Sequence, residues 1–217
     1  MIFVLREYYS GKEFIIASIC FILAFLISIT VHEFAHAFSA VKQGDDTPKY
    51  TGRYTLNPFS HIDPIGFLCS VLFFFGWAKP VKVNPTKFKN PRKGMALVSC
   101  SGVIANLILA FISCGIYMAM FTFITTYSNF VVIIINFFYI LFSINISLAV
   151  FNFLPFAPLD GFNFLCCFTK PDNKVVRFLA SYGYLILLII LTLFSNFLGI
   201  LIDTISYPMI AFWGWIF

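Results

Sequence analysis

Two of the three histidines in this chain lie four residues apart, in the sequence HEFAH (residues 32–36). Residues at this spacing share one face of an α-helix, so both imidazoles can reach the same metal ion. Glu33 follows the first histidine and lies close enough to activate a water molecule on that ion. The spacing therefore predicts a hydrolytic zinc site with His32 and His36 as metal ligands and Glu33 as the general base.

HEFAH lies in the last third of a long apolar run, roughly residues 14–40. A run of this length can cross a bilayer, and ionisable groups at membrane depth are costly and usually functional. The alternative is a chance pattern in a buried helix. The concentration of two of the three histidines within one helical turn argues against that alternative.

The composition is that of an integral membrane protein. Of the 217 residues, 60% are hydrophobic and 11% are charged, whereas soluble domains contain about 25% charged residues. This length allows about five or six membrane-spanning helices and no separate soluble domain. We therefore expect one all-α membrane domain over residues 1–217, built around a buried metal site, with its catalytic core at about 14–168 and C-terminal spans within 178–217. Residues 1–12 are mixed polar and are expected at the membrane interface rather than in a cleaved signal.

The charge pattern gives a topology. Residues 42–93 carry nine of the fourteen Lys and Arg residues, and the net charge of +5 resides in loops, which favours membrane orientation over nucleic-acid binding. Apolar runs at 95–127 and 130–153 separate this region from a second basic segment at 170–177. Both basic regions are therefore expected on the cytoplasmic side, with HEFAH pointing toward it. A further span is expected at 178–201, followed by a short aromatic tail or partial span at 206–217.

Six of the ten prolines lie in the basic region 42–93, so we expect irregular structure with short strands rather than long helices there. Its apolar stretch, residues 65–78, is short for a span; it either re-enters the membrane or crosses it. The six cysteines contain no CxxC pair and lie mostly in apolar runs, so neither disulfides nor metal ligands are expected among them.

Asp160 is the only charged residue between Gly94 and Thr169. It follows the prolines Pro155 and Pro158, which end the apolar run before it. An aspartate beside a glycine is also a common turn pair. Because an open zinc site takes three protein ligands and HEFAH supplies two, Asp160 is predicted to be the third ligand. Such a His-His-Asp set could also take other divalent ions.

These stretches together resemble the site-2 protease family of intramembrane zinc metalloproteases. HEFAH resembles the first family motif, and NFLPFAPLDG (residues 152–161) resembles the N-x-x-P-x-P-x-L-D-G motif. Ser101, Gly102, Ala105 and Asn106 resemble a middle motif, S-G-P-x-x-N. The sequences GRYTLNPFSHIDPIG (52–66) and FGWAKPVKVNP (75–85) resemble the compact subgroup that lacks a PDZ domain. Two positions depart from the pattern, since Val103 and Ala157 stand where prolines are usual; neither is an expected ligand.

The resemblance implies specific roles. His32, His36 and Asp160 would hold one zinc ion per chain, and Glu33 would activate the zinc-bound water. Asn106 and Asn152 would contact the substrate backbone or the oxyanion; the alternative is that these amides pack between helices. His61 is expected to approach the site as a substrate-binding or electrophilic group, and a structural hydrogen bond in its loop is the alternative.

The implied function is cleavage of membrane-protein substrates in or near their transmembrane segments, within the cell membrane and toward its cytoplasmic side. The implied partners are a transmembrane protein or peptide and the lipid bilayer, with no nucleic acid. A membrane-anchored metalloprotease acting at the membrane surface is one alternative. A metal-ion or proton transporter is another, although no inverted repeat is visible in the sequence. A catalytically silent scaffold is a third, against which the intact Glu33 argues. The sequence does not indicate an oligomeric state.

Overall fold

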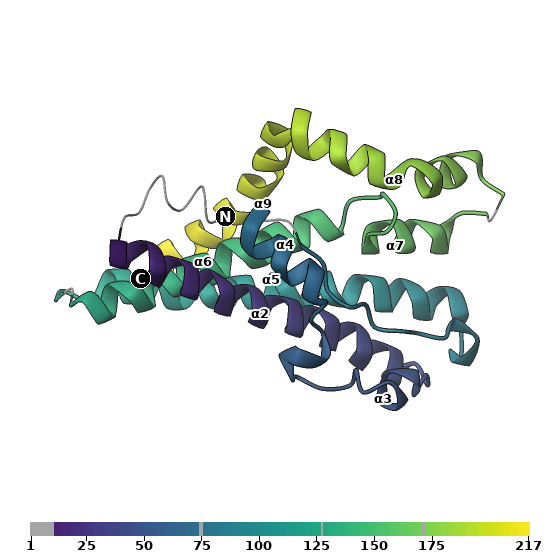
Figure 1. Cartoon of the computed structure of the whole chain (residues 1–217), viewed down its shortest axis with the longest axis horizontal. Coiled ribbons are helices and arrows are strands. Elements are labelled where there is room, and N and C mark those ends of the chain that lie inside the picture. The colour runs from purple at the N-terminus through teal and green to yellow at the C-terminus, as the bar shows by residue number, and fades with distance from the viewer. Residues whose placement is uncertain (1–10, 74–75, 127, 171) are drawn as a thin grey trace.

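The computed structural model describes residues 11–73, 76–126, 128–170 and 172–217 (Figure 1). Within these residues it contains no β-strand, and five helices are long and apolar enough to cross a membrane. They are α2 (Gly11–Lys42), α5 (Pro91–Phe123), α6 (Asn129–Asn152), α8 (Lys174–Leu193) and α9 (Ser195–Ile216). The expected all-α, multi-pass membrane architecture is confirmed. The expected interfacial segment, residues 1–12, lies almost entirely outside the described residues.

The proline-rich region 42–93 consists of short helical turns joined by extended segments. Its elements are α3 (Thr47–Tyr50), η1 (Pro58–Ser60), α4 (Pro64–Phe73) and η2 (Pro85–Lys87). The expected short strands are reduced, in the described part of this region, to one isolated antiparallel bridge between Ile62 and Ala78. The prolines explain this result, because proline suits the first turn of a helix and cannot donate to a strand ladder. With ten residues, α4 is about half as long as a membrane span requires.

Helices α2, α5 and α6 pack against one another and form the centre of the molecule (Figure 1). Small side chains allow close approach where they meet, since Ala24 and Ser28 of α2, Ala110 of α5 and Ala149 of α6 are almost fully buried. Large apolar residues on the outer faces, such as Ile104 and Ile108 of α5, are more than half exposed. This pattern suits a bundle whose outer surface meets lipid and whose polar groups point inward.

The C-terminal helices differ from the sequence-based expectation. A span at 178–201 and a short tail at 206–217 were expected, but the helical run breaks at Phe194 and leaves two helices of 20 and 22 residues. Helix α9 then packs on α5 and α6. Its Trp213 ring lies over Gly115, and the indole Nε1 donates to the Phe111 carbonyl at 3.0 Å. No glycine or proline lies at the break at Phe194, and the Ser195–Asn196 pair that follows it is a weak turn signal.

A short helix, α7 (Asp160–Phe168), follows the bend after α6 and packs on α5. Gly161 makes this bend possible: a Cβ there would lie 2.2 Å from the Phe153 carbonyl oxygen. Helix α8 also contacts the bend, because a Cβ at Gly183 would lie 2.3 Å from the Ala157 carbonyl oxygen. These close backbone contacts fix Asp160 at the start of α7, beside the central helices.

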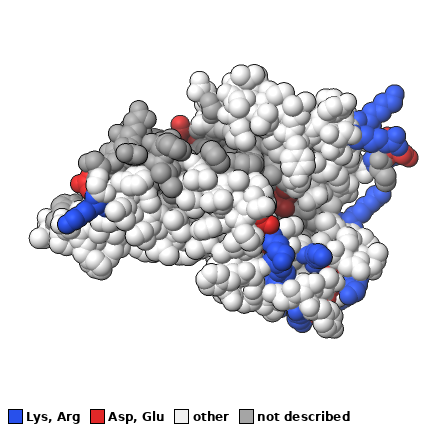
Figure 2. All heavy atoms as spheres, in the orientation of Figure 1, with Lys and Arg blue, Asp and Glu red and all other residues white. Residues whose placement is uncertain are grey.

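Lys and Arg side chains gather at one end of the molecule, on the right in Figure 2. The basic residues described there come from the region 42–93 and from residues 170–177, which include the first turn of α8. The C-terminal end of α2 and the N-terminal end of α5 lie at this same end (Figure 1). HEFAH, in the last third of α2, is therefore nearer to the basic end than to the opposite end.

Candidate functional site

The two HEFAH histidines are positioned by α2 and oriented by α5. His32 and His36 are buried on the face of α2 that packs against α5. The His36 Nδ1 lies 2.8 Å from the Val98 carbonyl oxygen of α5. A carbonyl can only accept, so Nδ1 carries the proton and donates it, and the lone pair of Nε2 is left for another partner. That tautomer is the one a metal ligand requires.

Asp160 reaches the same two imidazoles from α7. Its Oδ2 lies 3.2 Å from the His32 Nε2 and 3.1 Å from the His36 Nε2. The two Nε2 atoms are 3.0 Å apart. Three potential metal-ligand atoms thus lie close together, although the residues that carry them are far apart in the sequence. In the described part of the chain, these three residues are the group of His, Cys, Asp or Glu side chains placed to hold a metal ion.

The donor set and its geometry fit a zinc ion. Ligand atoms about 2.0–2.1 Å from a tetrahedral zinc lie about 3.3 Å from one another, close to the separations between these three atoms. A carboxylate oxygen only accepts, and His36 in the tautomer described presents a lone pair, so the cluster favours a cation at its centre. Three protein ligands are also the number that catalytic zinc sites use, with the fourth coordination position taken by water or substrate.

Gly102 of α5 makes the space for the two imidazoles. A Cβ at this position would lie 2.5 Å from the His36 Nε2 and 2.6 Å from the His32 Cε1. Both atoms belong to rigid rings on the buried face of α2, so moving them aside would disturb the packing around them. The middle motif therefore contributes a residue without a side chain at this position. It contributes no metal ligand.

We expect Gly102→Ala to lose most of its zinc, because the methyl group displaces the imidazoles from the metal position. Gly199→Ala in α9 is the control, since nothing lies within 4 Å of a Cβ at Gly199. Zinc per chain, measured by plasma mass spectrometry on both purified variants, checks the prediction. Full zinc occupancy in Gly102→Ala would contradict the described fit.

Glu33, the expected general base, is also buried, and one of its carboxylate oxygens is already held. The Val81 N–H donates to the Glu33 Oε2 at 3.1 Å. Val81 belongs to an extended segment, residues 78–84, between α4 and η2. This contact leaves the other oxygen, Oε1, without a hydrogen-bond partner among the described residues. One fixed oxygen and one free oxygen suit a carboxylate that receives and returns a proton.

The two asparagines expected to contact substrate differ in their surroundings. Asn106 of α5 lies one helical turn beyond Gly102; it is fully buried, and neither its Oδ1 nor its Nδ2 has a partner among the described residues. Asn152 is the last residue of α6 and is half-buried, and its Nδ2 donates to the Leu148 carbonyl of the same helix at 3.0 Å. Both amide atoms of Asn106 are therefore buried without partners among the described residues, whereas Asn152 has one donor engaged.

His61, the third histidine, is fully buried in the region 42–93 and is not brought into the group of metal-binding side chains. Its Nε2 lies 2.8 Å from the Thr55 carbonyl oxygen, and its backbone carbonyl accepts from the Lys79 N–H at 2.9 Å. These contacts fit the structural alternative for His61. A substrate-binding role stays a prediction.

Two groups that orient the site were not predicted from the sequence: the Val98 carbonyl on His36 and the Val81 N–H on Glu33. Both are backbone groups, so residue types carried no signal for them. The prolines around Val81 did indicate an extended segment there, but they did not indicate its contact with Glu33.

The comparisons with known proteins agree with one another. The family model described as Peptidase family M50 matches residues 20–133 and 119–190. A protein of Bacillus subtilis (strain 168), named "Putative zinc metalloprotease YwhC", is 39% identical over 171 residues, which cover 78% of this chain and 78% of that protein. A protein of Mycolicibacterium smegmatis, "Putative zinc metalloprotease Rip2", is 28% identical over 178 residues, covering 78% of this chain and 65% of that protein. No solved structure matches.

Proposed function

The chain belongs to peptidase family M50 and is a multi-pass membrane zinc metalloprotease, and from this premise we propose that it cleaves peptide bonds in or near the transmembrane segments of other membrane proteins. One observation carries the proposal. The Nε2 atoms of His32 and His36 and the Oδ2 of Asp160 lie 3.0–3.2 Å apart among helices long enough to span a bilayer, with Glu33 beside them. A metal site among such helices suits a substrate that is itself in the membrane.

In the proposed site, His32, His36 and Asp160 hold one zinc ion. Bound zinc supplies a Lewis acid that makes water more acidic and polarises the scissile carbonyl. The Val98 carbonyl fixes the His36 ring in the required tautomer. Gly102 leaves room for both rings, and the α5–α7 packing holds the Asp160 carboxylate against them.

Glu33 carries the proton in this proposal. The free Oε1 takes a proton from the attacking water and then delivers it to the leaving amine, while the Val81 N–H keeps Oε2 in place. Asn106 has both amide atoms without partners and can bond a substrate carbonyl or the developing oxyanion. Asn152 contacts the substrate backbone in the same proposal, through the amide oxygen that its bond to Leu148 leaves open.

The proposed environment is the cell membrane, with the active site toward the cytoplasm. The basic side chains at the end of the molecule nearer to HEFAH support this orientation (Figure 2). Helical substrate must unwind before cleavage, because the backbone of a helix is already hydrogen-bonded and shielded. Helix-breaking residues in the substrate lower that cost.

The test is cleavage by the purified protein in liposomes of a model transmembrane peptide that carries a central Asn-Pro or Gly-Gly pair. We expect cleavage inside the apolar segment, loss of activity with a zinc chelator, and recovery when zinc is added back. The matched substrate is a peptide with the same flanks and a soluble, polar centre. Mass spectrometry of the fragments locates the cut, and cleavage confined to the flanks or equal cleavage of the soluble peptide would favour a surface protease instead.

A further inference from the structure

The extended segment 78–84, which we call the strap, crosses the catalytic carboxylate and is fastened on both sides of it. At its first end, the Lys79 N–H donates to the His61 carbonyl at 2.9 Å, and the Arg53 guanidinium approaches the Lys79 carbonyl at 3.4 Å. In its middle, the Val81 N–H donates to Glu33. At its last residue, the Asn84 N–H donates to the Asp45 Oδ2 at 2.6 Å. The position of the Val81 N–H therefore depends on both ends.

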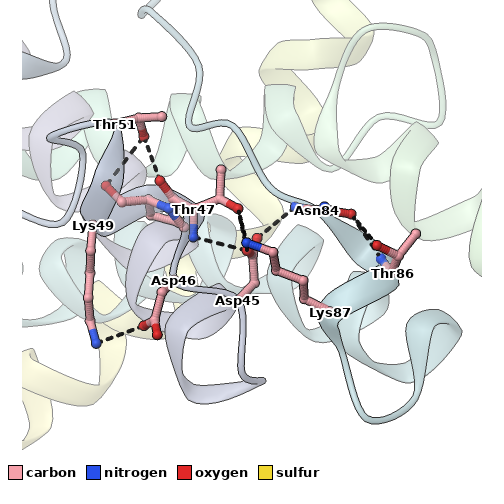
Figure 3. Close-up of polar contacts among 9 residues, drawn as sticks. Asp45, Asp46, Thr47, Lys49, Thr51, Asn84, Thr86 and Lys87 are labelled. Carbon is pink, nitrogen blue, oxygen red and sulfur yellow. Dashed lines mark hydrogen bonds and ion pairs between the residues drawn. The ribbon is translucent and has the colours of Figure 1, made fainter.

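Asp45 is held rigidly and in turn holds the last residue of the strap, so we call it the anchor (Figure 3). Its side chain is fully buried in the turn after α2, and both of its oxygens are used. Oδ1 accepts from the Thr47 N–H at 3.0 Å and the Thr47 hydroxyl at 2.5 Å, and Oδ2 accepts from the strap. The Lys87 ammonium lies 3.7 Å away and supplies an opposite charge. A buried carboxylate with these partners is held in one orientation.

The charge state of Asp45 supports this role. Burial acts to raise its pKa, but the hydrogen bonds from Thr47 and Asn84 and the nearby Lys87 outweigh burial and lower the pKa below its ordinary value. Asp45 is therefore an anion under physiological conditions, and an anion is the stronger acceptor for the strap amide.

Gly44 places Asp45 where it can reach the strap. Helix α2 ends at Lys42, and Gly44 adopts a φ of 102°, a conformation that L side chains rarely adopt. The chain then turns back, and the Asp45 N–H bonds to the Ala40 carbonyl at 3.0 Å. Asp45 is thus tied to the same helix that carries Glu33, so α2 supplies both the base and the anchor of the strap that orients it.

We propose that Asp45 is a positioning residue for Glu33, acting through the strap: its grip on the Asn84 N–H keeps the Val81 N–H on the Glu33 Oε2 and so keeps Oε1 directed at the attacking water. This inference rests on the proposed role of Glu33. Among the described residues, the Asp45 side chain contacts Thr47, Asn84 and Lys87 and none of the metal-binding side chains, so in this proposal it acts on the base and leaves the metal ligands in place.

The test is Asp45→Ala, compared with Asp46→Ala. Asp46 is the neighbouring acid, 46% exposed and paired with Lys49, so the control removes the same charge without touching the strap. We expect Asp45→Ala to lower kcat by about 10- to 100-fold with a smaller change in KM, since a displaced catalytic group costs rate at unchanged substrate contacts. Zinc per chain should stay at the wild-type level. Asp46→Ala should match wild type in all three quantities.

A second readout needs neither substrate nor activity. Hydrogen exchange measured by mass spectrometry on strap peptides should show faster exchange of the Val81 and Asn84 amides in Asp45→Ala, and unchanged exchange in Asp46→Ala. Should Asp45→Ala fail to fold, Asp45→Asn keeps an acceptor oxygen and nearly the same shape, and it should show the same changes at smaller size. Unchanged strap exchange, unchanged kcat, or a loss of zinc parallel to the loss of activity would each overturn the proposal.

The two readouts separate this proposal from the proposed function. If the wild-type protein cleaves nothing in a Glu33-dependent way while strap exchange still responds to Asp45→Ala, the protease mechanism fails and the anchor remains. If Glu33-dependent cleavage is intact and Asp45→Ala changes neither exchange nor kcat, the mechanism remains and the positioning role of Asp45 is wrong.

Discussion

Replacing Glu33 with glutamine is expected to remove proteolysis and leave the metal in place. Glutamine has nearly the same shape, and its amide oxygen can still accept the Val81 N–H that now reaches Oε2. It cannot take a proton from water at neutral pH. We therefore expect kcat to fall by about 10³-fold, in line with the loss of a general base. Zinc per chain and thermal stability should equal those of the wild type.

The matched control for this change is Glu13→Gln. Glu13 lies in the first turn of the same helix and is exposed, so the substitution removes an identical charge far from the metal group. The measurement is the initial rate of cleavage of a transmembrane peptide in liposomes, made together with zinc analysis. Appreciable cleavage by Glu33→Gln would mean that another group is the base, and loss of zinc would mean that Glu33 supports the metal.

Asp160→Ala is expected to cost the protein its zinc. The carboxylate is one of three donors and is the only one that comes from α7. Without it, two neutral imidazoles face the ion, and an open zinc site built on three protein ligands is incomplete. We expect about one zinc ion per chain in the wild type and a small fraction of that in the variant, with activity lost in parallel.

Asp172→Ala controls for the loss of an acidic side chain near α7. Asp172 is 89% exposed and pairs with Arg177, so its removal should leave zinc and activity unchanged. Plasma mass spectrometry after dialysis against a weak chelator gives the comparison. Zinc retained by Asp160→Ala would place the third ligand elsewhere and would reopen the surface-protease and transporter alternatives.

The sequence was most informative where chemistry demanded an unusual residue in an apolar run. HEFAH within residues 14–40 predicted a membrane helix carrying two imidazoles, and α2 has that form. Asp160 stood out because no other charged residue lies between Gly94 and Thr169, and the structure places its carboxylate against both imidazoles. Isolated charge at membrane depth is costly, so its position in the sequence was informative by itself.

The sequence was least informative where backbone groups and long-range packing decide the structure. The Val81 N–H that reaches Glu33 belongs to a strap that also bonds to Asp45 and His61, and no local sequence pattern indicates such contacts. Propensity also failed at the break before α9, since Phe194 is not a helix-breaking residue. The proline-rich region was correctly expected to lack long helices, but its prolines start short turns instead of bounding strands.

The contact between α2 and α7 has a consequence for the biosynthesis of this protease. HEFAH is near the start of the chain, whereas Asp160 is made only after α5 and α6. A partly synthesised chain that has inserted α2 alone offers two imidazoles and binds the ion weakly. With the proposed ligand set, we therefore expect metal loading, and with it proteolysis, to begin only after α7 has been translated and has folded against α5. On this proposal, the growing chain would gain the ability to cleave other membrane proteins only when most of it has been synthesised.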